Sequence, residues 1–345
     1  MDNPILVEVT RAGEVESAHR GAVCVVDATG RVIASVGDIT RPVCPRSAIK
    51  FLQALPLVES GAADAFHVTA EELALACASH SGELVHVSRV ESWLARLGLT
   101  AGHLECGCHA PSNQKAAEAL VCGGGSPSPL HNNCSGKHTG FLALALHLGV
   151  PLMGYTAPDH PVQKAVLGAV EDMCGIGQVP TVRDGCSAPN VFMPLTALAL
   201  GFARLGTGTG LSPSRAAAAQ RIRTAVKTYP VLMSGHGRPC TALIDALAGG
   251  GIVKTGAEGV FAAVLPERGL GLAVKIDDGA SRAAVVAITS LLNAFSAFRP
   301  QAADAVRGLM NPALTAWSGT VTGEIRPAMG YLMSLARSLN SGVPA

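Results

Sequence analysis

The first forty residues alternate short β-branched runs with polar turns, which is typical of antiparallel strands. Three such runs are expected to form strands, at residues 6–10, 22–27 and 32–36. The segment Asp27-Ala28-Thr29-Gly30 has the composition of a tight turn, and it separates the second run from the third. The pattern therefore predicts an antiparallel meander at the start of the chain.

From residue 46 onward the apolar positions recur every three or four residues, which indicates helices. A helix over residues 47–57 would bury one face that includes Ile49, Leu52 and Leu55. The segment Thr69-Ala70-Glu71-Glu72 is a capping box, so a helix is expected to begin there. The helices expected after residue 60 cover residues 70–78, 84–97, 136–148, 159–173, 191–205 and 212–227.

The strand pattern returns near the end of the chain. Residues 259–265 and 270–276 flank a four-residue loop, which predicts a second hairpin. A long apolar helix is expected to follow over residues 281–298.

Strands at both ends with helices between them favour an α+β fold. We expect one antiparallel sheet built from about residues 5–40 and 254–280, with flanking helices and an inserted helical region over about residues 60–230. The whole of residues 1–345 is expected to form a single catalytic domain.

Composition and charge exclude several classes of protein. Of the 345 residues, 48% are hydrophobic and only 15% are charged, so an intrinsically disordered chain is excluded. The formal net charge is +1 and Lys and Arg form no dense block, so no nucleic-acid binding is expected. The most apolar stretch, residues 141–153, is too short to span a membrane. Because the N-terminal residues lack the pattern of a signal peptide, we expect a cytoplasmic protein whose ten cysteines are mostly reduced.

Ser47 and Lys50 carry the first sign of chemistry, because their spacing of three places them on one face of a helix. A lysine can take the proton of a serine only when its amine is neutral. Lowering a lysine pKa from about 10.4 to about 7 costs about 4.6 kcal/mol, which burial and a second cation can supply. Lys254, in the tripeptide Lys254-Thr255-Gly256, is the candidate for that cation. The start of the helix would also offer N–H groups to a developing oxyanion.

The same spacing occurs a second time, at Ser112 and Lys115. By spacing alone, each pair can equally be a helix-capping serine with a solvated lysine. Three features favour Ser47: its helix is more apolar, it follows the strand meander, and Lys254 directly precedes the late hairpin. Ser79, in the small-residue segment 77–82, can be either an active-site hydroxyl or a helix cap.

Cysteine and histidine gather in three places that suggest zinc ligands. These are the segments Cys106-Gly107-Cys108-His109, residues 130–138, and Asp184-Gly185-Cys186-Ser187. No pair of CxxC motifs accompanies them, so buried thiols and capping side chains are the competing explanation. We prefer that explanation for Cys24, Cys77, Cys122, Cys174 and Cys240, and we leave the roles of Cys106, Cys108 and His131 open.

With these residues in view, the chain resembles the class 3, or rhizobial-type, L-asparaginases over nearly its whole length. Four segments carry the resemblance and are specific in combination: Pro45-Arg46-Ser47-Ala48-Ile49-Lys50, Cys77-Ala78-Ser79-His80-Ser81-Gly82, His131-Asn132-Asn133-Cys134-Ser135-Gly136-Lys137-His138-Thr139-Gly140 and Lys254-Thr255-Gly256-Ala257-Glu258-Gly259. Pro45 stands where the family motif has a serine, which leaves no role for a hydroxyl before Arg46.

The resemblance implies a fold similar to the serine β-lactamases and glutaminases, and a homodimer. It implies that Ser47 is the nucleophile and Lys50 its general base, and that Ser79 and Lys254 form a second Ser–Lys pair beside them. The family's zinc ion would be held by Cys134, Lys137 and Cys186, with Asp184 next to these ligands. A lysine ligand must be neutral, so zinc affinity should fall in acid.

The leading hypothesis from the sequence is therefore hydrolysis of L-asparagine to L-aspartate and ammonia through an acyl-enzyme on Ser47. Arg46 and His138 are candidates for the outer wall of the substrate pocket. The groups that bind the substrate's α-amino and α-carboxylate groups stay open, with four candidates: Asp278, Arg282, His236 and Arg238.

Three alternatives also stay open. One methylene separates glutamine from asparagine, so a glutaminase or a β-lactamase-like amidase has the same catalytic residues. A zinc-dependent hydrolase would use Cys134, Cys186 and a histidine to activate water. A non-enzymatic protein would use zinc only to hold its fold.

Overall fold

A computed structural model describes residues 2–341, and its centre is one antiparallel sheet of eight strands. Along the sheet the strands follow the order β11 (Ala313–Thr315), β12 (Val321–Pro327), β1 (Ile5–Arg11), β2 (Glu14–Asp27), β10 (Leu270–Ile276), β9 (Val260–Leu265) and β8 (Ile252–Thr255), and β3 (Val32–Val36) pairs with β2. The predicted sheet from both chain ends is confirmed, because β2 pairs directly with β10.

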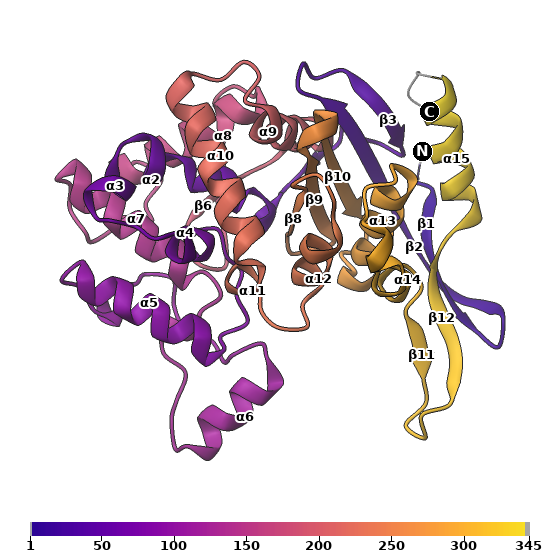
Figure 1. The fold of residues 1–345 in the computed structure, drawn as a ribbon, viewed down its shortest axis with the longest axis horizontal. Helices are drawn as coiled ribbons and strands as arrows, with labels where there is room; N and C mark the ends of the chain where they lie inside the picture. Colours follow the sequence, from indigo (N-terminus) through magenta and orange to yellow (C-terminus); the bar gives the residue numbers. More distant parts are fainter. Residues whose placement is uncertain (1, 342–345) are drawn as a thin grey trace.

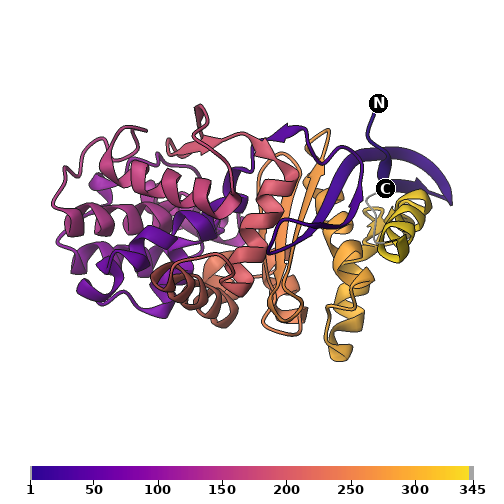
Figure 2. The same cartoon turned by 90° about the horizontal axis from the view of Figure 1, so that it is seen from above.

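Helices cover both faces of the sheet (Figure 1). α9 (Leu195–Thr207) packs against β2, β9 and β10, and α13 (Ser281–Ala294) packs against β9, β10 and β12. Figure 2 shows most of the helices from the middle of the chain gathered on one side of the sheet, away from the C-terminal helix. The α+β architecture with an inserted helical region is therefore confirmed.

Most predicted helices are present with small shifts at their ends. Those before the late strands are α3 (Ala62–Ala65), α4 (Ala70–Ala76), α5 (Leu84–Arg96), α6 (Gln114–Cys122), α7 (Ser135–Leu148), α8 (Pro161–Cys174), α10 (Pro213–Thr228), α11 (Pro230–Met233) and α12 (Pro239–Ala246). The capping box at Thr69 and Glu72 is formed as predicted. The helix expected from residue 191 begins only at Leu195, because the short strands β6 (Pro189–Val191) and β7 (Met193–Pro194) take the preceding residues. Two further short strands are β4 (Pro42–Val43) and β5 (Thr181–Arg183).

The predicted helix over residues 47–57 is wrong in its continuity. The segment forms a 3₁₀ turn over Arg46–Ile49, then α1 (Lys50–Gln53) and α2 (Leu55–Glu59). Pro56 is one cause, because it has no N–H to donate to the carbonyl of Leu52. Ser47 consequently lies in a 3₁₀ turn, and Lys50 is the first residue of a short helix.

The sequence pattern missed the last two strands, β11 and β12, and it did not place α14 (Ala303–Met310) or α15 (Met329–Ser341). Only Ile325 of β12 is fully buried, and β11 is three residues long, so neither strand shows the alternation that reveals a half-buried strand. The register joins Val9 of β1 to Ile325 of β12, so the chain ends meet in the sheet.

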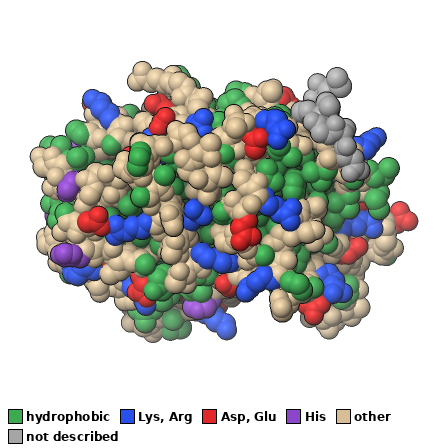
Figure 3. Space-filling view, turned by 45° about the horizontal axis from the view of Figure 1, so that its top comes forward, with side chains coloured by type: hydrophobic (Ala, Val, Ile, Leu, Met, Phe, Trp, Pro, Cys, Tyr) green, Lys and Arg blue, Asp and Glu red, His purple; other side chains and the backbone are tan. Residues whose placement is uncertain are grey.

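The surface carries positive and negative side chains interspersed, as the face in Figure 3 shows. None of the helices over residues 2–341 combines the length and the apolar character that crossing a membrane requires.

Candidate active site

Lys50 is a buried amine with three close partners. Its side chain is 1% exposed. Its Nζ lies 2.7 Å from the carbonyl oxygen of Ala78, 2.9 Å from Ser79 Oγ and 3.0 Å from Cys134 Sγ. Lys50 therefore joins the end of α4, which leads to Ser79, to the start of α7, where Cys134 lies.

Lys254 approaches the same serine from the sheet. It lies on β8, its side chain is 1% exposed, and its Nζ is 2.8 Å from Ser79 Oγ and 3.1 Å from the carbonyl oxygen of Thr255. The hydroxyl of Ser79 thus lies between two lysines that are 204 positions apart in sequence (254 − 50). The predicted second Ser–Lys pair is brought together, and Lys50 is part of it.

Two buried amines this close cannot both keep an ordinary pKa. Burial, followed by the charge of Lys50, lowers the pKa of Lys254 from 10.5 to about 7. A lysine near neutrality and a second cation beside it are the conditions that serine activation requires. The lysine whose pKa falls to this value is Lys254, on the distant strand.

Ser47 and Ser79 open onto one cavity of about 330 Å³. The backbone N–H of Lys50 donates to the carbonyl oxygen of Ser47, but among the described residues no side-chain hydrogen bond joins the two, and the Lys50 amine points to Ser79 instead. The residues that line the cavity are Ser47, Ser79, Asn133, Ser234, Arg238, Pro239, Cys240, Thr255, Gly256, Ala257, Phe261, Ser281 and Val285. Two serines and the end of β8 therefore face one space that can hold a small molecule.

Arg46 holds the turn that carries Ser47. Its backbone has φ +52°, a left-handed conformation that is costly for a residue with a Cβ. Its Nε donates to Asp184 Oδ1 at 2.8 Å, and Asp184 also accepts from the N–H of Gly185 and from Asn190. This ion pair ties the Ser47 turn to the loop of Cys186. Arg46 is not among the cavity-lining residues.

The three predicted zinc ligands meet beside Lys50. Lys137 Nζ lies 3.2 Å from Cys186 Sγ. The Cys134 thiol, followed by Lys137 and His138, stabilises the Cys186 thiolate and holds the pKa of Cys186 far below its ordinary value against the opposing effect of burial. Burial disfavours the charge of Lys137, but the Cys186 thiolate outweighs it and raises the pKa of this amine. These residues therefore form a buried cluster of two sulfurs and one amine.

Their chemistry fits a zinc ion. Two cysteine sulfurs are donors that zinc prefers, and the amine of Lys137 offers a nitrogen lone pair once it has lost its proton. His138 Nδ1 contacts the Tyr155 hydroxyl at 2.7 Å, and the same ring interacts with the sulfur of Cys186. Within the part of the chain that the structure describes, no three His, Cys, Asp or Glu side chains converge as a metal site, so the amine of Lys137 would have to be a ligand. His138 is buried in α7 and does not line the cavity.

The candidates for binding the substrate's charged groups differ in whether they line the cavity. Of the four proposed for the substrate's charged groups, only Arg238 lines the cavity; His236 contacts Glu83, and Asp278 and Arg282 contact His19. Sequence reasoning missed Asn133, Ser234 and Thr255 as cavity residues, although Asn133 lies within the dense polar segment 130–138.

The cysteine expectations hold for four residues and fail for one. Cys24, Cys77, Cys174 and Cys240 are buried as expected, but Cys122 is exposed because α6 buries none of its residues. Cys106 is buried and Cys108 exposed, and neither takes part in a disulfide.

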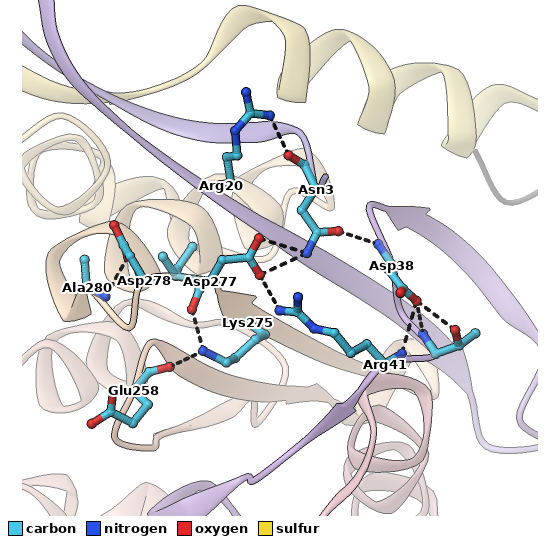
Figure 4. A network of polar contacts seen from close by, with 11 residues as sticks. Asn3, Arg20, Asp38, Arg41, Glu258, Lys275, Asp277, Asp278 and Ala280 are labelled. Atoms are coloured by element: carbon cyan, nitrogen blue, oxygen red, sulfur yellow. Dashed lines mark hydrogen bonds and ion pairs between the residues drawn. The ribbon is translucent and has the colours of Figure 1, made fainter. Parts of the chain in front are cut away.

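A polar network supports the loop that follows β8 (Figure 4). Lys275 Nζ donates to the carbonyl oxygen of Glu258 at 2.7 Å. Asp277 accepts from Asn3 at 3.0 Å and from Arg41 at 2.5 Å, as Figure 4 shows. The loop that lines the cavity through Gly256 and Ala257 is therefore held to β10 by Lys275, and Asn3 and Arg41 hold Asp277 at the end of that strand.

Comparisons with known proteins place these residues in a family. The family described as L-asparaginase II matches residues 7–327 of the chain. A solved structure of a beta-lactamase from Mycobacterium bovis is similar at 16% identity and TM-score 0.38, over 84% of this chain and 94% of that chain. Simvastatin synthase from Aspergillus terreus is similar at 12% identity and TM-score 0.38, over 74% of this chain and 86% of that chain. Nothing among the curated proteins matches the chain significantly.

The low pKa of Lys254 predicts a pH-dependent stability. Between pH 7, near the folded pKa, and pH 10.5, the unfolded pKa, the unfolded state binds more protons than the folded state. The free energy of unfolding that burying Lys254 takes away therefore becomes smaller as the pH rises. The stabilisation of Lys254→Met relative to the wild type, measured by urea unfolding, should therefore be larger at pH 6 than at pH 9 by about 2.5 kcal/mol.

Lys115→Met is the matched control, because Lys115 is exposed on α6. It should follow the wild type at both pH values. Equal stability differences for Lys254→Met at pH 6 and pH 9 would contradict the assignment of a depressed pKa to Lys254.

Proposed function

The chain belongs to the L-asparaginase II family, and we propose that it hydrolyses the side-chain amide of L-asparagine to L-aspartate and ammonia. Family membership supports an amidohydrolase in general. The observation that carries the finer proposal is the arrangement around Ser79: Lys50 and Lys254 both donate to its hydroxyl, and Ser79 shares a cavity with Ser47.

In the proposed reaction Ser47 Oγ attacks the carbon of the substrate amide and forms the acyl-enzyme. Lys50 first passes its own proton through the Ser79 hydroxyl to the neutral amine of Lys254, and Lys50 then takes the proton of Ser47. The C–N bond breaks as the leaving nitrogen takes a proton from Ser79, and the amine of Lys254 or Lys50 restores it. Water then attacks the ester, which releases aspartate and returns the proton to Ser47.

The oxyanion that forms during both steps needs preorganised donors. We assign the N–H of Ser47 as one of them, because Ser47 lies in the 3₁₀ turn that faces the cavity. The left-handed backbone of Arg46 sets the direction of that turn, and its ion pair with Asp184 maintains it. Arg46 and Asp184 therefore act by positioning Ser47.

We propose that a zinc ion is held by Cys134, Lys137 and Cys186. When bound, zinc would supply a Lewis acid that polarises or holds the substrate. Lys137 must lose its proton to become a ligand, so zinc affinity should weaken in acid. The sulfur of Cys134 also lies 3.0 Å from Lys50 Nζ, so the proposed zinc ligands are in direct contact with the Ser–Lys residues.

The family resemblance further suggests a homodimer in the cytoplasm, with a small-molecule substrate and neither a nucleic-acid nor a membrane partner. The remaining alternatives are a glutaminase or β-lactamase-like amidase, which would use the same residues, and a zinc-dependent hydrolase, which would use Cys134 and Cys186 with a histidine.

Removal of the nucleophile is the first prediction. Ser47→Ala should lower kcat for ammonia release from L-asparagine by more than about 1,000-fold, because the acyl-enzyme cannot form. Thermal unfolding should stay near that of the wild type, since Ser47 is partly exposed and lines the cavity.

Ser112→Ala is the matched control, because exposed Ser112 just before α6 and Lys115 on that helix repeat the spacing of Ser47 and Lys50. It should retain full activity. Activity retained in Ser47→Ala would contradict the mechanism.

Metal removal separates the alternatives. Ammonia release from L-asparagine and from L-glutamine should be measured with and without a chelator, together with the zinc content of the protein. We expect kcat/KM to be higher for asparagine than for glutamine. The extra methylene of glutamine limits this discrimination to about 1–3 kcal/mol. The metal-free enzyme should keep part of its kcat with a higher KM. Complete loss of kcat that zinc restores would favour the zinc-dependent hydrolase.

A further inference from the structure

We propose that Arg238 binds the α-carboxylate of the substrate and thereby restricts this enzyme to amides that carry a carboxylate. This inference rests on the function proposed above and assigns a role in it to a residue outside the Ser–Lys arrangement. Arg238 immediately precedes α12, and it lines the cavity that contains Ser47 and Ser79.

The charge of the cavity wall is the first observation. Among the described residues that line the cavity, Arg238 is the only one with a charged side chain. The other lining side chains are uncharged. No Asp or Glu of the described chain lines it. A cavity of this kind attracts an anionic group and offers no carboxylate to an ammonium group.

The side chain of Arg238 is also free to bind. Among residues 2–339 its guanidinium has no hydrogen bond or ion pair, and its Nε is buried. A buried N–H without a partner costs free energy until an acceptor arrives. A carboxylate fits this need best, because guanidinium and carboxylate form two parallel hydrogen bonds.

The loop that carries Arg238 is fixed to the segment that carries Ser79. Glu83 accepts from the N–H of His236 at 3.0 Å and from the Ser81 hydroxyl at 2.5 Å. Gly235 has φ +132°, and a Cβ there would lie 2.1 Å from Ser81 Oγ, so the two segments are in direct contact. The separation between Arg238 and the reacting serines is therefore set by the fold.

A fixed separation makes Arg238 a specificity residue. A substrate whose carboxylate binds Arg238 presents its amide at one defined distance, which favours one chain length over the next. The α-amino group meets only hydroxyl, amide and carbonyl groups, such as those of Ser234 and Ser281. The carboxylate should therefore contribute more to recognition than the amine does.

Three amides of equal chain length test this assignment: L-asparagine, succinamate, which lacks the α-amino group, and 3-aminopropanamide, which lacks the carboxylate. For the wild type, kcat/KM should fall about 100-fold from L-asparagine to 3-aminopropanamide and about tenfold or less to succinamate. Arg238→Met should lower kcat/KM about 100-fold for L-asparagine and succinamate, mainly through KM, and should leave 3-aminopropanamide within about threefold of the wild type. Arg238→Lys should recover part of the loss.

Arg223→Met is the matched control. Arg223 is half-buried on α10, its Nε also lacks a hydrogen-bond partner, and it does not line the cavity. This variant should behave as the wild type with all three amides. An equal loss on all three amides in Arg238→Met, or no loss on any, would overturn the role of Arg238.

A binding measurement separates this inference from the proposed function. If the wild type releases ammonia from none of the three amides, the proposed function fails, and calorimetry with succinate then tests the carboxylate site directly. Succinate should bind the wild type and Arg223→Met but bind Arg238→Met at least about tenfold more weakly. Equal binding to all three proteins, or no binding to the wild type, would overturn the inference.

Discussion

The hydroxyl of Ser79, held between the amines of Lys50 and Lys254, is the interaction on which the rest of the site depends. Both amines are buried, and two charged lysines on one hydroxyl would repel each other in an environment that screens poorly. Burial and the charge of Lys50 lower the pKa of Lys254 to about 7. A fold that keeps such a group in place gains a proton acceptor that works near neutral pH, and it gives up stability to do so.

Three separate parts of the fold bring these residues together. The 3₁₀ turn at Arg46–Ile49 packs beside β8, so that the first lysine meets the strand that carries the second. Ser79 follows α4, which lies against α7 so closely that a Cβ on Gly136 would be 2.4 Å from the carbonyl oxygen of Leu75. That close approach also sets Cys134 beside Lys50, and the Arg46–Asp184 ion pair joins the loop of Cys186 to the same turn. The serine residues and the thiols therefore form one connected structure.

The sequence predicted which residues form the site, but it did not predict how burial changes the pKa of Lys254. The spacing of Ser47 and Lys50, the tripeptide at Lys254 and the family resemblance together named the residues that meet, and the helix of Lys115 buries none of its residues. The sequence could not tell how far the pKa of Lys254 falls, because that depends on burial and on distances across the fold. The same limit applies to Arg238, one of four candidates until the cavity was known, and to Cys122, whose exposure follows from the position of α6. The sequence pattern did not reveal strands β11 and β12, because only one of their residues, Ile325, is fully buried.

The central claim is that the amine of Lys254 is neutral near pH 7 and exchanges protons with Ser79. The pH dependence of kcat/KM for ammonia release from L-asparagine, compared between the wild type and Lys254→Arg, tests it most directly. The wild-type rate should rise with pH through about 7, because the proton on Lys254 must leave first. Lys254→Arg, whose side chain stays charged, should be nearly inactive at every pH. A wild-type profile that stays flat from pH 5 to 9, or a Lys254→Arg enzyme with the same profile as the wild type, would contradict the account.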